Sequence, residues 1–163
     1  MINPADITQR KTNYDLRFLL ALLLVYRSNF HLMHWLVKGA NFNTLHEQCK
    51  GYYDMLLDDA DEVAEMLLRG HQQPVNYQEA NDLLDKCQDR NFKMLESTRD
   101  FNSEECNIIT KELLSDIKFV IEEVLHTMNA DDDITRVGIK SQLEAMHNKY
   151  DLELNYKTYR RTM

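Results

Sequence analysis

Residues 31–69 read HLMHWLVKGANFNTLHEQCKGYYDMLLDDADEVAEMLLR and combine two histidines with a row of acids. His34 and His46 lie on either side of a turn, and a helical pattern follows the second histidine. Within that pattern Asp61 and Glu65 lie one helical turn apart, so both carboxylates point the same way. Imidazole and carboxylate together favour iron, zinc or manganese over calcium or magnesium. The stretch is therefore a candidate transition-metal site, for which the remaining chain looks like the scaffold.

The composition predicts an all-α protein with a single domain over residues 1–163. Only 4 glycines and 2 prolines occur in the whole chain, and so few turn formers indicate long helices with few breaks. At 19.3 kDa the chain is long enough to bury a core of its own. The three cysteines, Cys49, Cys87 and Cys106, have no metal-binding spacing, which favours a reduced, intracellular protein.

The charge balance bears on the possible partners. Asp and Glu number 27 against 19 Lys and Arg, a formal net charge of −8, which attracts cations and repels nucleic acid at long range. The N-terminal residues show no signal-peptide pattern, and the longest apolar run, FLLALLLV at 18–25, fits a buried helix better than a membrane span. We therefore expect a soluble, cytoplasmic protein with neither DNA nor a membrane as a partner.

Apolar residues recur at helical spacing in four long segments, 12–37, 44–70, 104–128 and 133–157. The core stripe expected for the second segment is Cys49, Tyr53, Leu56, Ala60, Ala64 and Leu67, and that for the third is Ile109, Leu113, Ile117, Val120, Val124 and Met128. The first segment is apolar on more than one side, which predicts contacts with its own bundle and with another subunit. Gly39 is expected to cap its C-terminus, and Thr44-x-x-Glu47 to form a capping box for the second helix. A short helix near 78–87 is expected in the long connection that follows. Four long helices with one long crossover predict a ferritin-like four-helix bundle.

Two Glu-x-x-His pairs, Glu123/His126 and Glu144/His147, have the spacing of metal sites inside helical bundles. At about 100° per residue, however, His126 lies roughly opposite the apolar stripe of its helix. Glu144 also lies well off the stripe of its own helix, and the first helix has no glutamate to complete such a site. Both pairs are therefore interpreted as solvent-facing.

The third grouping comprises His34, His46, Asp61 and Glu65. His46 lies close to the core stripe of its helix, whereas the two carboxylates lie roughly 100° or more from the centre of that stripe. The histidines and carboxylates cannot readily converge within one bundle. A shared site would have to lie between two subunits, with histidines from one and carboxylates from the other. On spacing alone, a solvated acidic helix edge beside a core histidine is the favoured interpretation, because charged helix edges are common.

The same stretch resembles the signature of the Dps family, the twelve-subunit mini-ferritins. The matching positions follow without a gap: His34-Trp35, Gly39, Phe42, Leu45-His46-Glu47, Asp61 and Glu65. The acids at 131–133 and the order of the helices are also similar. The resemblance implies a homododecameric shell with a ferroxidase centre at each two-fold subunit interface.

In such a centre, His34 and His46 of one subunit and Asp61 and Glu65 of its neighbour would bind iron. The resemblance implies oxidation of Fe(II) to Fe(III) by peroxide or oxygen, iron storage inside the shell, and protection against oxidative damage. Trp35 would lie beside the centre and intercept oxidising equivalents.

Two departures from the family pattern affect these expectations. Many members have an aspartate four residues after the second histidine, where this chain has Lys50. Lysine removes a ligand and opposes a second iron, unless it pairs with an acid such as Asp54 one turn away. The first alternative to a ferroxidase is therefore a structural shell that binds a single metal weakly.

The second departure concerns DNA. Family members that bind DNA often carry a lysine-rich tail, but residues 1–13 contain only Arg10 and Lys11 as basic residues. The C-terminal KTYRR at 157–161 is basic but short. A nucleoid-compacting, DNA-binding protein is thus the second alternative, and the net charge disfavours it.

Overall fold

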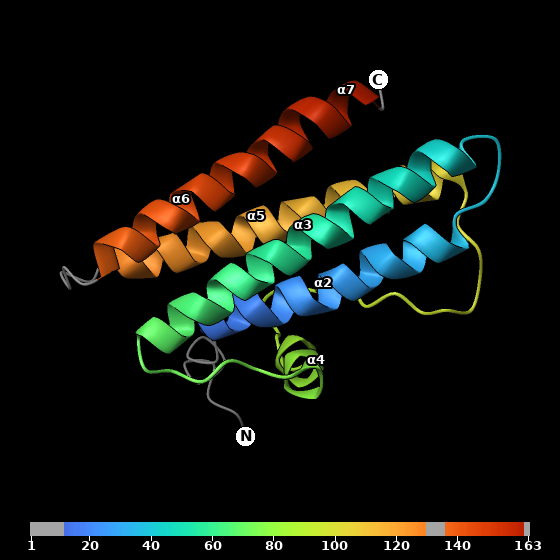
Figure 1. Cartoon of the computed structure of the whole chain (residues 1–163). Helices are drawn as coiled ribbons and strands as arrows, with labels where there is room; N and C mark the ends of the chain where they lie inside the picture. The colour runs from blue at the N-terminus through green and yellow to red at the C-terminus, as the bar shows by residue number, and fades with distance from the viewer. Residues whose placement is uncertain (1–11, 130–135, 162–163) are drawn as a thin grey trace.

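A computed structural model of the chain describes residues 12–129 and 136–161. The long helices are α2 (Leu16–Leu36), α3 (Phe42–Arg69), α5 (Ser103–Asn129) and α6 (Val137–Leu152), and the short α4 (Tyr77–Asp85) lies between α3 and α5. Figure 1 shows α2 and α3 as one antiparallel pair and α5 and α6 as a second. The prediction of an all-α four-helix bundle with a short extra helix in the long connection is confirmed. The predicted helix start at 133 and the acids at 131–133 lie outside the described residues.

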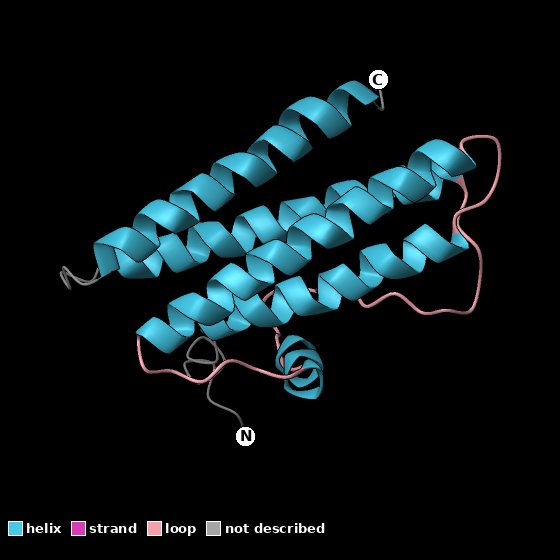
Figure 2. Cartoon of the chain, in the orientation of Figure 1, coloured by secondary structure: helices cyan, strands magenta, loops and turns pink. Residues whose placement is uncertain are grey.

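The long crossover follows from the direction of the helices. Because α5 runs parallel to α3, the chain must return along the bundle after α3 ends, as the loops in Figure 2 show. The last residues of the crossover, which connects α3 to α5, lie beside the α2–α3 turn. There the Phe101 amide donates a hydrogen bond to the Leu36 carbonyl oxygen, and the Lys38 amide donates one to the Phe101 carbonyl oxygen, both at 2.9 Å. The start of α5 is thereby fixed beside the turn between the two histidine-bearing helices.

The α2–α3 turn differs from the sequence prediction at its first end. α2 ends at Leu36 with Val37 as its extended C-cap, so the assignment of Gly39 as the cap is wrong. Gly39 instead makes the turn itself with a φ of 113°, which glycine adopts without a Cβ clash. Its carbonyl oxygen accepts a hydrogen bond from the Phe42 amide at 3.1 Å.

The predicted capping box at the second end of this turn is also wrong. α3 begins at Phe42, two residues before Thr44, and its N-cap Asn41 makes no side-chain capping bond. Thr44 therefore lies inside the helix and not at its N-cap, so the Thr44 hydroxyl and the Glu47 carboxylate cannot form a capping box. The early start places His46 within the second turn of α3.

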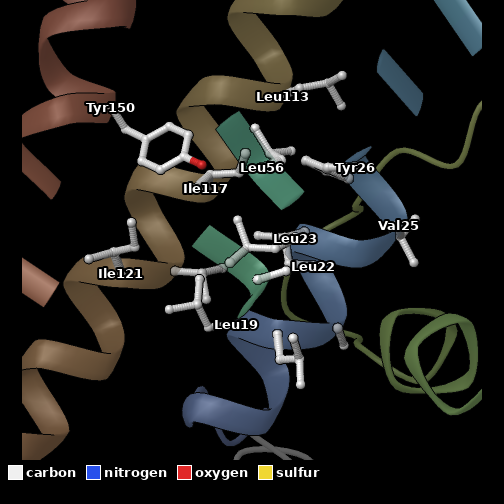
Figure 3. Packing of buried hydrophobic residues seen from close by; sticks show 14 of the residues in the cluster. Leu19, Leu22, Leu23, Val25, Tyr26, Leu56, Leu113, Ile117, Ile121 and Tyr150 are labelled. Atoms are coloured by element: carbon white, nitrogen blue, oxygen red, sulfur yellow. The ribbon is translucent and has the colours of Figure 1, made fainter. Parts of the chain in front are cut away.

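The hydrophobic core lies between the apolar stripes of the long helices. Figure 3 shows part of this core, where side chains of α2, α3 and α5 pack together. The α5 stripe is buried as predicted, at Ile109, Leu113, Ile117, Val120, Val124 and Met128. In α3 the buried side is rotated from the prediction, because Tyr53 and Ala64 are only half-buried while Tyr52, Val63 and Met66 are buried. This rotation leaves Tyr53 and His46 at the edge of the core.

α2 is buried on most of its surface. α3 and α5 cover one part of it, and α4 packs on another, below it in Figure 1. Part of the apolar surface that was assigned to another subunit thus has its partner within the same chain. By length and composition α2 could cross a membrane, but 67% of its most apolar window is buried in the bundle, as expected of a core helix.

A buried carboxylate fastens the crossover to the bundle. Asp116 on α5 is 7% exposed, and it accepts hydrogen bonds from the Tyr26 hydroxyl at 2.5 Å and from Arg90 Nε at 2.9 Å. The Tyr26 hydroxyl also accepts a hydrogen bond from the backbone amide of Lys93 at 3.0 Å. Burial and the charge of Asp116 raise the pKa of Tyr26 well above its usual range, so the phenol remains a donor.

We expect Tyr26→Phe to lower the free energy of unfolding by about 1–3 kcal/mol, because Asp116 stays buried with one donor fewer. Urea denaturation at a fixed protein concentration measures the change. Tyr77→Phe is the matched control, since Tyr77 is 50% exposed and its hydroxyl accepts a hydrogen bond from Arg27 at the surface. The control should change stability by less than about 0.5 kcal/mol. Equal effects of the two substitutions would contradict the assignment.

Candidate metal centre

Two histidine rings face each other across the α2–α3 turn. The rings of His34 and His46 stack with their centroids 3.6 Å apart and an interplanar angle of 17°. Nδ1 of His34 lies 2.6 Å from the backbone carbonyl oxygen of His46, and Nδ1 of His46 lies 2.7 Å from that of His34. A carbonyl oxygen only accepts hydrogen bonds, so both Nδ1 atoms carry a proton and donate it.

These reciprocal bonds fix the chemistry of the pair. With Nδ1 protonated, a neutral imidazole presents Nε2 as its lone pair, which is the form that binds metals. His34 is 9% exposed, His46 is half-buried, and Phe42 stacks beside the His46 ring at 4.9 Å. The two rings are therefore held in place by packing and by the backbone before any ligand binds.

The two carboxylates lie on the solvent side of the same helix as His46. Asp61 and Glu65 are both exposed, in agreement with their predicted angle from the core stripe. Across the described part of the chain neither makes a hydrogen bond or an ion pair. They are free to bind a cation that approaches α3 from outside.

The helix keeps the histidines and the carboxylates apart. α3 is continuous from Phe42 to Arg69, so at about 1.5 Å per residue His46 and Asp61 are about 22 Å apart along its axis. Two nitrogen or oxygen ligands of one ion lie only roughly 4 Å apart. The four residues therefore cannot bind one ion within a single chain. In residues 12–129 and 136–161 no group of three or more His, Cys, Asp and Glu side chains is placed to hold a metal.

The two Glu-x-x-His pairs do not form a site inside the bundle. His126 and Glu144 are exposed, as expected from their phase. His147 is half-buried, and its Nε2 lies 2.9 Å from Glu122, a residue outside either pair. That hydrogen bond and the nearby Lys118 hold the pKa of Glu122 below its usual range. His147 thus joins α6 to α5.

Lys50 pairs with Asp54, as one of the alternatives from the sequence anticipated. Its Nζ lies 2.9 Å from Asp54 Oδ2, and the hydrogen bond raises the pKa of Lys50. The two side chains are 49% and 54% exposed. On α3, Lys50 lies about one turn and Asp54 about two turns after His46, so the pair is between the histidines and the carboxylates.

Sequence reasoning missed two aromatic neighbours of the histidine pair. The His31 ring stacks on Trp35 with centroids 3.9 Å apart and on Tyr53 at 4.5 Å. The Tyr53 ring in turn meets His34 edge-on at 5.4 Å. The sequence contained a signal for these neighbours. His31 precedes Trp35 by four positions and Tyr53 follows His46 by seven, and residues at these spacings lie on the same face of a helix.

Two of the three cysteines, Cys49 and Cys106, are buried. Cys49 follows His46 by three residues and is 2% exposed, and burial raises its pKa to about 12. Burial likewise raises the pKa of Cys106 to about 11. All three cysteines are free thiols. They show no metal-binding arrangement, in line with their spacing in the sequence.

Comparison with known proteins gives three results. The family model of the ferritin-like domain matches residues 15–130. A DNA protection during starvation protein of Porphyromonas gingivalis is 48% identical over 58 residues, 36% of each chain. One from Listeria innocua is 42% identical over 67 residues, which are 41% of this chain and 40% of that protein. The chain thus matches about two fifths of the length of these curated relatives.

Solved structures show the same fold. Dps from Listeria innocua, soaked with cobalt, has a TM-score of 0.71 at 24% identity over 88% of this chain and 86% of that one. The antigen TpF1 of Treponema pallidum has a TM-score of 0.71 at 20% identity over 97% and 96%. A DPS protein of Vibrio cholerae, described as ferritin-like diiron-carboxylate, has a TM-score of 0.67 at 21% identity over 86% and 84%.

The reciprocal histidine bonds predict energetic coupling in the metal-free protein. His34→Ala should lower the free energy of unfolding by about 1–3 kcal/mol, because it removes one bond and leaves the His46 ring without its stacking partner. His46→Ala should cost less in that background, with a coupling of about 0.5–3 kcal/mol in a double-mutant cycle.

His126→Ala serves as the control in the same urea titrations, since this histidine is exposed and distant in sequence from the pair. Its effect should stay within about 0.5 kcal/mol. Strictly additive effects of the two single substitutions would show that the pair is not coupled.

Proposed function

Because the chain belongs to the ferritin-like family, and within it to the Dps family, we propose that it oxidises Fe(II) to Fe(III) and stores the iron. Residues 1–163 act as one domain, and twelve copies assemble into a hollow shell in the cytoplasm. Iron is both the substrate and the cargo of this shell, and its removal limits oxidative damage. The observation that carries the proposal is the His34/His46 pair, whose Nδ1 bonds leave both Nε2 atoms for metal.

A two-fold axis can complete the site. In an isologous interface, residue i of one subunit meets residue j of the other, and j meets i. If two copies of α3 pack antiparallel, His46 of one copy meets Asp61 and Glu65 of the other when the axis passes near Asp54 and Met55. Two equivalent sites then form, each with histidines from one subunit and carboxylates from its neighbour.

The exposed side of α3 is suited to this packing. Leu57 and Leu68 are 36% and 52% exposed, which is unusual for leucines without a partner. At about 100° per residue, Leu57, Asp61 and His46 lie within roughly 60° of one another around the helix. One interface could therefore bury the leucines and contain both halves of the metal site.

The ligand set favours the oxidised product. Imidazole nitrogen and carboxylate oxygen both suit iron, and two carboxylates stabilise Fe(III) more than Fe(II) because the interaction grows with the charge of the ion. Oxidation therefore becomes easier at the site than in solution, with peroxide or oxygen as the electron acceptor. The net charge of −8 per chain draws further cations to the shell.

DNA binding has little support from the described C-terminus. Lys157 pairs with Glu153 at 2.7 Å, and Arg161 donates to the Tyr52 hydroxyl at 3.1 Å, so two of the basic side chains already have partners. The guanidinium of Arg160 lies over the ring of Tyr156 in the same segment, 5.9 Å from its centroid. We therefore propose a shell without a nucleic-acid partner.

Anaerobic Fe(II) titration of the assembled protein, followed by stopped-flow oxidation with peroxide, tests the proposal. We expect saturable binding and fast oxidation, both lost in the variant that combines His46→Ala with Asp61→Ala, because each interfacial site then lacks ligands from both subunits. His126→Ala should bind and oxidise iron like the unaltered protein. Cobalt(II) in place of iron reports binding without oxidation. Binding that survives loss of His46 and Asp61 would contradict the proposed site.

Lys50 is expected to limit each site to one iron. Its pair with Asp54 leaves little net charge to repel a cation, but the two paired side chains lie between the two ligand groups and offer no free ligand to a second iron. Lys50→Asp should raise the iron bound per site from one towards two and speed oxidation, while Lys50→Gln separates loss of charge from gain of a ligand. Two irons per site in the unaltered protein would show that Lys50 is no obstacle.

A further inference from the structure

A cavity lies at the end of the bundle opposite the α2–α3 turn, where α3 and α5 end and α6 begins (Figure 1). Its volume is about 430 Å³, and three basic residues line it, Arg69, His71 and Arg136. We propose that this cavity binds a phosphate monoester, that is, a phosphate group on a small organic body. The site is separate from the proposed iron oxidation and does not require it.

The charge of the cavity is opposite to that of the chain. The chain carries a net charge of −8, yet none of the described residues that line the cavity is acidic. Arg69 and Arg136 together supply two positive charges, and a phosphate monoester carries a charge of about −1.5 to −2 at pH 7. A hollow lined by one sign of charge attracts the opposite sign, because its low-dielectric walls focus the field.

Arg69 has no acidic partner in the part of the chain that the structure describes. Its guanidinium donates a hydrogen bond to the side-chain oxygen of Gln142 on α6, which is a neutral group. Glu65 lies one turn before Arg69 on α3 and makes no ion pair with it, whereas Arg90 and Arg99 each pair with a carboxylate. A guanidinium has five N–H donors in a planar fork, so Arg69 keeps donors for two phosphate oxygens.

His71 adopts a backbone conformation that favours glycine. Its φ is 59°, and no other non-glycine residue among those described has a positive φ. It follows Gly70, the C-cap of α3, and its amide donates to the Leu68 carbonyl oxygen at 3.1 Å. The Gln72 amide donates to the Leu67 carbonyl oxygen at 2.9 Å. At this position of such a helix end glycine is usual, because a Cβ atom makes the left-handed conformation costly.

The His71 side chain is available to a ligand. Its imidazole makes no hydrogen bond or ion pair with the residues that the structure describes. A strained residue whose side chain lines a cavity indicates that the side chain itself is needed there. Imidazole can donate a hydrogen bond to a phosphate oxygen.

The first turn of α6 forms another wall of the cavity. Gly138 and Ile139 line it, and the N-cap Arg136 makes no side-chain capping bond. The first amides of an α-helix have no partner within the helix, and the helix dipole favours an anion at this end. The backbone of α6 thus adds to the attraction that the three basic side chains provide.

The floor of the cavity is apolar, which favours an organic phosphate over the free ion. Leu16, Met66 and Met128 line it, and all three are buried in the bundle. The volume of about 430 Å³ falls in the range of pockets for small organic ligands, about 300–1,000 Å³. A phosphate ion would contact the basic rim alone, whereas the organic body of a monoester can cover the apolar floor.

Isothermal titration calorimetry of the metal-free, assembled protein tests the site, with phenyl phosphate as the probe. We expect saturable binding of one molecule per chain. Inorganic phosphate should bind at least about tenfold more weakly, because it leaves the apolar floor uncovered. Equal affinities for the two probes would overturn the organic ligand in favour of the free ion, and no binding of either probe would overturn the site.

Substitutions of the arginines test which residues hold the phosphate. Arg69→Gln and Arg136→Gln should each weaken the binding of phenyl phosphate by about tenfold or more. Arg160→Gln is the matched control, since it removes the same charge from an exposed arginine beyond the other end of α6, and it should bind like the unaltered protein. Circular dichroism confirms that each variant is folded. Unchanged affinity in the variant that combines Arg69→Gln with Arg136→Gln would overturn the site.

His71→Gly separates a role in binding from a role in the fold. Glycine relieves the backbone strain at this position, so the thermal midpoint of the ligand-free protein should rise. The affinity for phenyl phosphate should fall by about fivefold or more, because one donor to the phosphate is lost. A higher midpoint with unchanged affinity would overturn the part of His71 in the site.

Discussion

The continuity of α3 is the constraint on which the site depends. A helix without a break from Phe42 to Arg69 fixes the distance between His46 at one end and the carboxylates at the other, at about 22 Å. The chain therefore carries two candidate half-sites, the histidine pair and the two carboxylates, that no side-chain rotation can join. Any metal chemistry that uses both groups of ligands requires a second copy of the chain. In our proposal, iron oxidation therefore depends on subunit assembly.

The fold alone holds the histidine pair of the proposed site in place, without a metal. Gly39 turns the chain so that α2 and α3 run antiparallel, and each histidine donates to the other's carbonyl. The crossover then fastens the same turn through Phe101. Preorganised ligands lose little conformational freedom on binding, because their rotamers and tautomers are already set. The carboxylates of the proposed site are exposed instead, as our proposal requires of residues that meet a neighbouring subunit.

Much of this could be predicted from the sequence. The α5 stripe, the short α4 and the solvent-facing Asp61 and Glu65 follow from helical periodicity, which a long amphipathic segment records clearly. The turn could not be predicted correctly, since Thr44-x-x-Glu47 is a good local signal that the position of Gly39 overrides. The stack of His31 on Tyr53 joins two helices, and its contacts depend on the rotation of α3 about its axis. Periodicity gives that rotation only to within about one residue. For this reason the sequence predicted a buried Tyr53, whereas the buried residue is Tyr52.

Subunit complementation tests the shared site most directly. One variant lacks the histidines (His34→Ala, His46→Ala) and the other lacks the carboxylates (Asp61→Ala, Glu65→Ala), so neither should bind iron at the interface by itself. Co-assembled in equal amounts, half of the interfaces pair unlike subunits, and each restores one of its two sites. The account predicts recovery of about a quarter of the iron sites of the unaltered protein. No recovery in verified mixed assemblies would contradict it.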